Sequence, residues 1–549
     1  MNSNSPVGLR HWLSFSLLAG MLLLSCAREG IAVPFPIGFP SEVGVTTYYV
    51  DAQHGNDTNN GTSPKSAWQS LNKVNATTFQ PSDSILLKAG CAWEGQLWPK
   101  GSGREGEPIH LGSYGSGAKP LIRGNGQVED AVLLKNQEYW EIENLEITNV
   151  GERKAVRRGV HLALDNFGEA HHLVVRGMTI HYVSGRDDSK SNGGITITAD
   201  GETKPSRFVG LLIEDNHIYH VDRNGISSWS DRWERSKWFP SLGVVVRGNT
   251  LEDIGGDGIM IAATDGALIE KNVVGNANQR SEGYNIAIWS WSADNTVIQY
   301  NEAYGTKGER DGEGFDSDWN SRNTLIQYNY SHDNEGGFLL ICNEGGHSAA
   351  ENLGNIGTIV RYNISQNDRN RGFTLSGPVK DTQIYNNTIY VGEGHSVDLV
   401  LLTDWNGWPR ETEFSNNIFY AQGEARLGQG IERAKDGHHT SAAGWGESQG
   451  TEFDSNVYFG NISAGKEVTV PKACNDGHAQ TNDPEFVDPG KGALGRATLE
   501  GYALKSESKA RESGKRIAND GGKDFWGAGL EGCVALDRGA VRSSNCKSP

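Results

Sequence analysis

The sequence predicts an all-β fold built as a parallel β-helix, and three observations lead to this class. Gly supplies 71 of the 549 residues, about twice its usual share. Long runs rich in Ala, Leu, Glu and Lys are scarce, which favours short strands joined by tight turns. Short apolar segments that end in Asn recur through the middle of the chain. Such a repeat is typical of a solenoid, which can use the whole length as one continuous body.

The first repeat is an apolar pair followed by a polar or variable pair and then Asn, as in Val297-Ile-Gln-Tyr-Asn301. The steps between successive repeats run from 23 to 39 residues, which indicates coils with loops inserted at their corners. Stacked coils place equivalent residues about 4.8 Å apart, so we expect the side-chain amides to form a structural ladder. The ladder residues are Asn216, Asn249, Asn272, Asn301, Asn329 and Asn363, with weaker copies at Asn387, Asn417 and Asn456.

A second strand family has the pattern polar-Gly-apolar-x-apolar, as in Glu313-Gly-Phe-Asp-Ser317. Because side chains alternate along a strand, one set is predicted to enter the core: Ile226, Ile259, Tyr284, Phe315, Phe338 and Phe373. The next residues are predicted to face outward: Ser227, Met260, Asn285, Asp316, Leu339 and Thr374. A second outward row follows two residues later: Trp229, Ala262, Ala287, Asp318, Ile341 and Ser376.

The N-terminus predicts export. Arg10 precedes an apolar run from Leu13 to Leu24, and the segment Leu23-Leu-Ser-Cys26 resembles a bacterial lipoprotein signal. The resemblance implies that Cys26 is lipidated and that the protein is an outer-membrane lipoprotein, in the periplasm or at the cell surface. A cleaved secretory signal is the alternative.

The remaining chain divides into a Pro-containing linker at 27–45, a β-helix at 46–465 and an irregular capping region at 466–549. The net charge of −18 argues against a nucleic-acid partner, because phosphates are bound through clustered Lys and Arg. We expect a monomer that acts on an extracellular polysaccharide and touches the membrane only through its lipid anchor. Cys342 follows an apolar strand and is expected to be a buried thiol.

The N-terminal part of the predicted β-helix carries a family resemblance. The segments Tyr48–Pro64, Ser82–Gly90 and Pro108–Leu111 resemble the opening of secreted right-handed parallel β-helix proteins of the pectate-lyase-like superfamily. The resemblance implies a right-handed solenoid, which we expect to contain about eleven or twelve coils. It indicates a carbohydrate-active protein but does not assign an activity.

The outward row contains two carboxylates on one strand. Asp316 and Asp318 are two residues apart, so their Cα atoms are expected roughly 6.6 Å apart with both side chains facing solvent. Close like charges raise one pKa, which places a general acid beside a carboxylate base or nucleophile. The pattern therefore favours a glycoside hydrolase with Asp316 and Asp318 as its catalytic pair. Glu313 is a further catalytic candidate, with a turn role or a metal role as alternatives.

Aromatic and polar residues near this strand predict a sugar-binding surface, since sugar rings stack on aromatic faces. About half of the Trp residues beside the strands are expected to be exposed. The substrate-binding candidates are Trp229, Trp289, Trp319, Asn285, Glu344, His347 and Arg371.

Two alternatives stay open. Gly312-Glu-Gly-Phe-Asp316 is similar to the calcium segment of family nine pectate lyases, which implies a polysaccharide lyase with Ca²⁺ at Glu313 and Asp316. Thr374 stands where that family has its catalytic Lys, so an Arg or Lys would have to act as base. The other alternative is a non-catalytic glycan-binding or adhesive β-helix.

Overall fold

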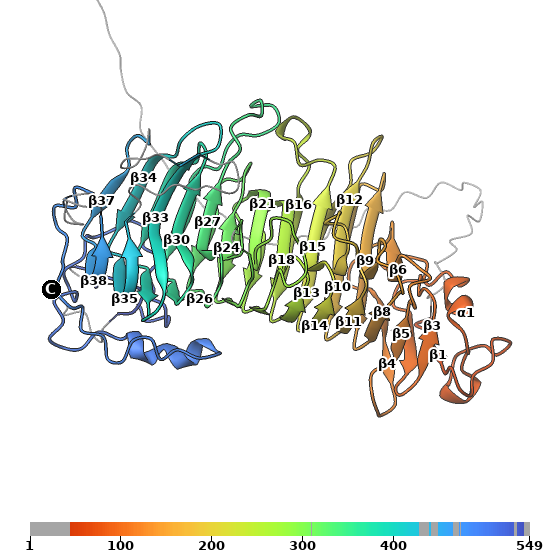
Figure 1. The fold of residues 1–549 in the computed structure, drawn as a ribbon. Helices are drawn as coiled ribbons and strands as arrows, with labels where there is room; N and C mark the ends of the chain where they lie inside the picture. Colours follow the sequence, from red (N-terminus) through yellow and green to blue (C-terminus); the bar gives the residue numbers. More distant parts are fainter. Residues whose placement is uncertain are drawn as a thin grey trace, which may run out of the picture. The chain divides into compact units, whose positions relative to one another are not determined.

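The chain is described here from a computed structural model, which covers residues 44–308, 310–427, 439–440, 448–464, 472, 474–531 and 535–542. Lipidation at Cys26 and most of the 27–45 linker lie outside these residues. The strands form three parallel sheets that wind around one core, and successive coils follow one another along the helix axis (Figure 1). The chain is thus a parallel β-helix, as predicted.

The first sheet carries the predicted acidic strand. Its members are β6 (Asp130–Lys135), β9 (Arg158–Asp165), β12 (Gly193–Asp200), β15 (Asn224–Ser230), β18 (Ile259–Asp265), β21 (Ile288–Asp294), β24 (Glu313–Ser317), β27 (Gly337–Cys342), β30 (Asn370–Ser376) and β33 (Ser396–Asp404), with β36 (His439–Thr440) added antiparallel.

The second sheet holds the strands that precede the ladder Asn residues. They are β1 (Thr47–Val50), β2 (Ser84–Lys88), β4 (Ile109–Tyr114), β7 (Trp140–Glu143), β10 (Glu169–Arg176), β13 (Arg207–Glu214), β16 (Ser241–Arg247), β19 (Leu268–Glu270), β22 (Val297–Gln299), β25 (Leu325–Gln327), β28 (Ile359–Arg361), β31 (Lys380–Tyr385), β34 (Arg410–Ser415) and β37 (Glu452–Asp454).

In the third sheet, the strands from β14 onward each begin directly after a ladder Asn. The sheet consists of β3 (Ala92–Glu94), β5 (Leu121–Arg123), β8 (Glu146–Asn149), β11 (Thr179–Val183), β14 (His217–Val221), β17 (Thr250–Ile254), β20 (Val273–Gly275), β23 (Glu302–Tyr304), β26 (Tyr330–His332), β29 (Ile364–Gln366), β32 (Thr388–Val391), β35 (Ile418–Arg426) and β38 (Val457–Ser463). The short helices are η1 (Pro64–Ser66), α1 (Leu71–Asn75), η2 (Arg235–Lys237) and η3 (Arg496–Tyr502).

The predicted Asn ladder connects the coils at the turn between the second and third sheets. Asn301 Nδ2 donates to Asn329 Oδ1 at 3.1 Å, and Asn329 Nδ2 donates to Asn363 Oδ1 at 3.0 Å. The same bond joins neighbours from Asn216 to Asn456, and Asp476 accepts the last one. The residue before each Asn has a positive φ, as at Tyr300, so the ladder holds a turn that L-residues rarely adopt.

The register of the first sheet differs from the prediction in two coils. Ile288, and not Tyr284, pairs with Phe315, because the pattern at 282–286 belongs to a loop before β21. Leu339 pairs with Phe315 in the next coil. A slip of one residue exchanges the two faces of a strand.

The slip changes which residues face outward. Leu340 and Cys342 therefore lie on the outward rows, whereas Leu339 and Ile341 are fully buried in the core. Ala287, predicted to face outward, is also in the core.

Both ends of the core are covered. Helix α1 contributes Leu71 and Val74 to the core at the N-terminal end, where Figure 1 shows it beside β1 and β3. Cys474 adds to the core at the other end, and the tail from about 485 turns back to pack Leu499 and Tyr502 on the third sheet. Among the described residues, no helix is long and apolar enough to cross a membrane.

The ladder predicts a stability effect in the middle of the solenoid. Asn301→Ala removes the acceptor of two bonds from Asn272 and should lower the free energy of unfolding by about 2 to 4 kcal/mol, since buried donors lose their partner. Urea denaturation measures this. Asn461→Ala, at an exposed Asn with one surface hydrogen bond, is the control and should change stability by about 0.5 kcal/mol or less. Equal effects of the two substitutions would contradict a structural ladder.

Candidate active site

A pocket of about 540 Å³ lies over the first sheet, on the outward face of β21, β24 and β27. Loops from neighbouring coils complete its walls. The residues that line it are Lys190, Trp229, Met260, Tyr284, Asn285, Ile286, Trp289, Trp291, Arg310, Asp311, Asp316, Asp318, Trp319, Leu340, Cys342, Arg371, Ser376 and Trp405.

Strand β24 places its acidic residues on the pocket floor. Asp316 pairs with Trp289 of β21 on one side and with Leu340 of β27 on the other. Asp318 follows the strand, and its backbone N–H donates to the Ser290 carbonyl at 2.9 Å. Phe315 and Ser317 point into the core and are fully buried. The alternation of β24 thus presents both predicted carboxylates to the pocket.

The two carboxylates form a cluster with a thiol. Oxygens of Asp316 and Asp318 and the sulfur of Cys342 lie within 4.8 Å of one another. Cys342 Sγ–H donates to Asp318 Oδ1 at 2.8 Å, and the Trp319 backbone N–H donates to the same oxygen at 2.7 Å. Asp316 is 1% exposed, and its Oδ1 has no hydrogen-bond partner among the described residues.

Burial changes the proton affinity of the pocket acids. It raises the pKa of Asp311 to about 8, with a further contribution from the Glu313 charge. Burial and the Asp318 charge raise the pKa of Asp316 well above its usual value. Burial also raises the pKa of Asp318 to about 6, while the Cys342 and Trp319 hydrogen bonds oppose the increase. At neutral pH the pocket therefore contains both a proton donor and a carboxylate.

Glu313 lies apart from this cluster and does not line the pocket. Its carboxylate is fully buried and pairs with the Arg371 guanidinium, Nη2 to Oε1 at 3.1 Å. Arg371 also donates to the backbone carbonyls of Gly336 and Asp311. The Glu313–Arg371 pair thus holds the backbone beneath the pocket. The partner of the Glu313 carboxylate in this structure is thus the Arg371 guanidinium.

Among the described residues, Asp316, Asp318 and Cys342 form the one group of three side chains that lie close enough together to hold a metal ion. Ca²⁺ prefers a shell of oxygen ligands, which a cysteine does not complete. The Cys342 thiol proton is engaged with Asp318. We therefore interpret the group as an acid–base cluster.

Aromatic side chains form the pocket wall. The Trp229 and Trp291 ring centroids are 5.1 Å apart, and those of Trp291 and Trp319 are 5.4 Å apart. Trp291 and Trp319 pack with Met260 and Leu340, and most of the Trp residues beside the strands are buried or half-buried, so the expectation that half of them are exposed is wrong. Trp229, 42% exposed, is the open member at this pocket. The rings enclose a site instead of forming a flat platform.

The other predicted binding residues divide into two groups. Asn285 and Arg371 line the pocket, but Asn285 reaches it from a loop and not from a strand. Glu344 and His347 do not line it; His347 stacks on Trp319 with centroids 5.1 Å apart. The structure adds Asp311 and Lys190, which lie outside the strand repeats and so gave no periodic signal.

The raised pKa of Asp318 predicts a pH-dependent stability effect. The folded state holds this proton more tightly than the unfolded chain. The stabilisation that the proton contributes is therefore fully present below about pH 4 and is lost as the pH rises through 6. Asp318→Asn should therefore increase the free energy of unfolding by about 2 to 3 kcal/mol at pH 8 and change it little at pH 4. Urea denaturation at both pH values measures it.

The matched control is Glu94→Gln on the exposed end of β3, which should have a small effect at either pH. A stability change in the Asp318 variant that is the same at pH 4 and pH 8 would contradict the assignment of a raised pKa.

Sequence comparison places this chain among β-helix proteins. The family described as "Right handed beta helix region" matches residues 193–389. The lacto-N-biosidase of Bifidobacterium longum subsp. longum is 28% identical over 598 residues, which cover 91% of this chain and 35% of that protein. The chain thus spans about a third of the length of that curated relative.

Solved structures give the same grouping. The selenomethionine derivative of the GH136 lacto-N-biosidase from Eubacterium ramulus matches with a TM-score of 0.59 and 25% identity, over 76% of this chain and 68% of that chain. Its native form gives a TM-score of 0.56 and 26% identity, over 70% and 68%. XylC in complex with xylose shares the fold, with a TM-score of 0.51 and 12% identity over 91% and 99%. The chain is a right-handed parallel β-helix that is similar to GH136 lacto-N-biosidases.

Proposed function

We propose that this protein is a glycoside hydrolase that cleaves short terminal units from extracellular glycans. The observation that carries the proposal is a Trp-walled pocket lined by three carboxyl groups with raised pKa values, of which Asp316 is buried and Asp311 and Asp318 are half-buried. Similarity to lacto-N-biosidases supports a lacto-N-bioside as the unit released. A pocket of about 540 Å³ with aromatic walls suits a glycan end better than the middle of a long polysaccharide.

Asp318 is the proposed nucleophile. Its pKa of about 6 lies below that of Asp311, which is about 8, so Asp318 carries a negative charge at neutral pH. Hydrogen bonds from Cys342 and Trp319 hold its Oδ1. This carboxylate attacks the anomeric carbon and forms a glycosyl ester while the bond to the leaving oxygen breaks.

Asp316 or Asp311 is the proposed acid, because burial raises the pKa of Asp311 to about 8 and that of Asp316 well above its usual value. The acid gives its proton to the leaving oxygen, then takes one from the water that hydrolyses the ester. Carboxyl groups about 5 to 5.5 Å apart are typical of retention, whereas inversion needs about 6.5 to 9.5 Å. One oxygen of Asp316 lies within 4.8 Å of one oxygen of Asp318, and the covalent glycosyl ester proposed for Asp318 implies retention.

The lyase alternative receives less support. Arg371, one of its candidate bases, is engaged with Glu313 and three backbone carbonyls. Of the two proposed calcium ligands, Asp316 lines the pocket and Glu313 does not. A purely adhesive β-helix would give no role to the three carboxyl groups with raised pKa values that line the pocket.

The N-terminal segment supports a proposal on location. A lipoprotein-type signal ending at Cys26 would place the enzyme outside the cytoplasm, at the outer membrane or cell surface, where extracellular glycans are accessible. We propose that it acts there as a monomer.

Single Asn variants at 311, 316 and 318 distinguish the proposed roles. The Asp318 variant should lose activity on both a lacto-N-bioside-capped glycan and an activated aryl lacto-N-bioside. The acid variant should lose about 100- to 10,000-fold on the glycan but still form the glycosyl ester from the aryl substrate, whose leaving group needs no proton. Added azide should then accelerate turnover of the acid variant.

The control is Glu94→Gln, far from the pocket on β3. Proton NMR of the first product should show the anomeric configuration of the substrate. Full activity in all three Asn variants, or a product with new ultraviolet absorbance from an unsaturated sugar, would contradict the proposal.

A further inference from the structure

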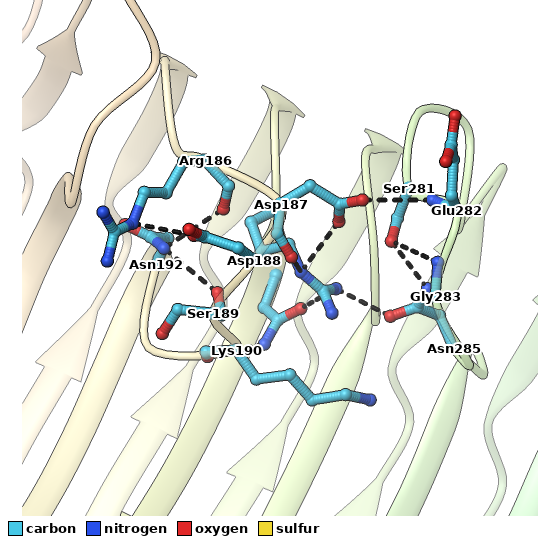
Figure 2. Close-up of polar contacts among 12 residues, drawn as sticks. Arg186, Asp187, Asp188, Ser189, Lys190, Asn192, Ser281, Glu282, Gly283 and Asn285 are labelled. Atoms are coloured by element: carbon cyan, nitrogen blue, oxygen red, sulfur yellow. Dashed lines mark hydrogen bonds and ion pairs between the residues drawn. The ribbon is translucent and has the colours of Figure 1, made fainter.

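Two loops at the edge of the pocket are tied together. One is Arg186–Asn192, between β11 and β12, and the other precedes β21 at 276–287. The Asp187 carboxylate accepts a hydrogen bond from the Glu282 backbone N–H at 3.1 Å, as Figure 2 shows. The loops come from coils that are not adjacent, so this contact bridges the coils between them.

Arg223 lies beneath this bridge. Its side chain is 3% exposed; Nε lies 3.2 Å from Asp187 Oδ1, and Nη1 donates to Asn285 Oδ1 at 2.6 Å. Asn224 Nδ2 next to it donates to the Lys190 carbonyl at 2.9 Å. The backbone of Lys190 is thus fixed by the same network that joins the loops.

The Lys190 side chain extends from the loop to the pocket wall. Nζ donates to Asp257 Oδ2 at 2.9 Å and to the Tyr284 carbonyl at 2.8 Å, and it lies 4.6 Å from the centroid of the Trp289 ring. Asp257 is fully buried and also accepts from Trp289 Nε1 at 3.0 Å. The ammonium is therefore held in one place although the side chain is a third exposed, at 33%.

We propose that Lys190 is a positioning residue of the reaction, a fixed counter-charge that keeps one carboxylate of the pocket ionised. This inference rests on the proposed function and adds to it a residue that lies outside strand β24. No hydrogen bond joins Lys190 to Asp311, Asp316 or Asp318 among the described contacts, so its charge acts through space.

The electrostatic effects of Lys190 and Asp257 have opposite signs. The Lys190 charge lowers the pKa of Asp311, of Asp316 and of Asp318. The Asp257 charge raises the pKa of Asp318. The other charged or titratable groups at or behind the pocket are Arg223, Arg310, Glu313, Cys342 and Arg371. Lys190 and Asp257 thus form an ion pair in which a substitution can remove the charge of either partner separately.

The test is the pH dependence of kcat/KM for Lys190→Met, Lys190→Arg and Asp257→Asn. The acid limb reports ionisation of the nucleophile. Lys190→Met should move it to higher pH by about one unit, and Asp257→Asn should move it to lower pH. Lys190→Arg keeps the charge, so its acid limb should stay within about 0.3 unit of the parent.

A merely structural role predicts a different result. If Lys190 only holds the loops together, breaking its ion pair from either side should have the same effect. Shifts of the acid limb in the same direction for Lys190→Met and Asp257→Asn, or no shift in either, would therefore overturn the inference. Circular dichroism spectra identical to the parent establish that each variant is folded.

A second measurement does not depend on turnover. The melting temperature of the parent should fall as pH rises from about 4 to 8, because the folded-state pKa values of Asp311 and Asp318 are raised. Lys190→Met should steepen this fall and Asp257→Asn should flatten it. These changes without any glycosidase activity would refute the proposed function but support the counter-charge. Unchanged slopes with normal activity would refute the counter-charge alone.

Discussion

The hydrogen-bonded Asn ladder is the interaction on which the rest of the structure depends. Each Asn bonds to the next coil, and each follows a residue in the left-handed region, so the ladder stabilises a turn that would otherwise be unfavourable. Because this turn is repeated in register from Asn216 to Asn456, loops of different length can be inserted elsewhere without disturbing the stack. The stacked strands therefore form a rigid sheet. This sheet accommodates a group of carboxyl groups on its outward face, although bringing them together costs free energy.

That face places carboxyl groups where neighbouring coils have apolar side chains. Asp316 lies between Trp289 and Leu340, in a setting that disfavours its charged form. Protons on the cluster, the Cys342 hydrogen bond and the nearby Lys190 charge reduce the cost in different ways. The same burial that destabilises the carboxylates separates their pKa values, and this separation is what acid–base catalysis requires.

Much of the fold follows from the local sequence. The Asn repeat predicts the ladder because a coil can stack only if equivalent residues meet, and alternation along β24 predicts the outward direction of Asp316 and Asp318. The errors came from Gly336-Gly337, which permits two alignments, and from the 282–286 loop, which imitates a strand. Lys190 and the Glu313–Arg371 pair could not be predicted, since they depend on contacts between distant coils.

A crystal structure of the Asp318→Asn variant with a lacto-N-bioside-capped glycan tests the central claim most directly. The claim predicts that the terminal disaccharide fills the pocket against Trp289 and Trp291. Its scissile oxygen should lie within hydrogen-bond reach of Asp311 or Asp316, with the anomeric carbon facing position 318. A glycan bound on another face, or a scissile linkage out of reach of all three positions, would contradict it.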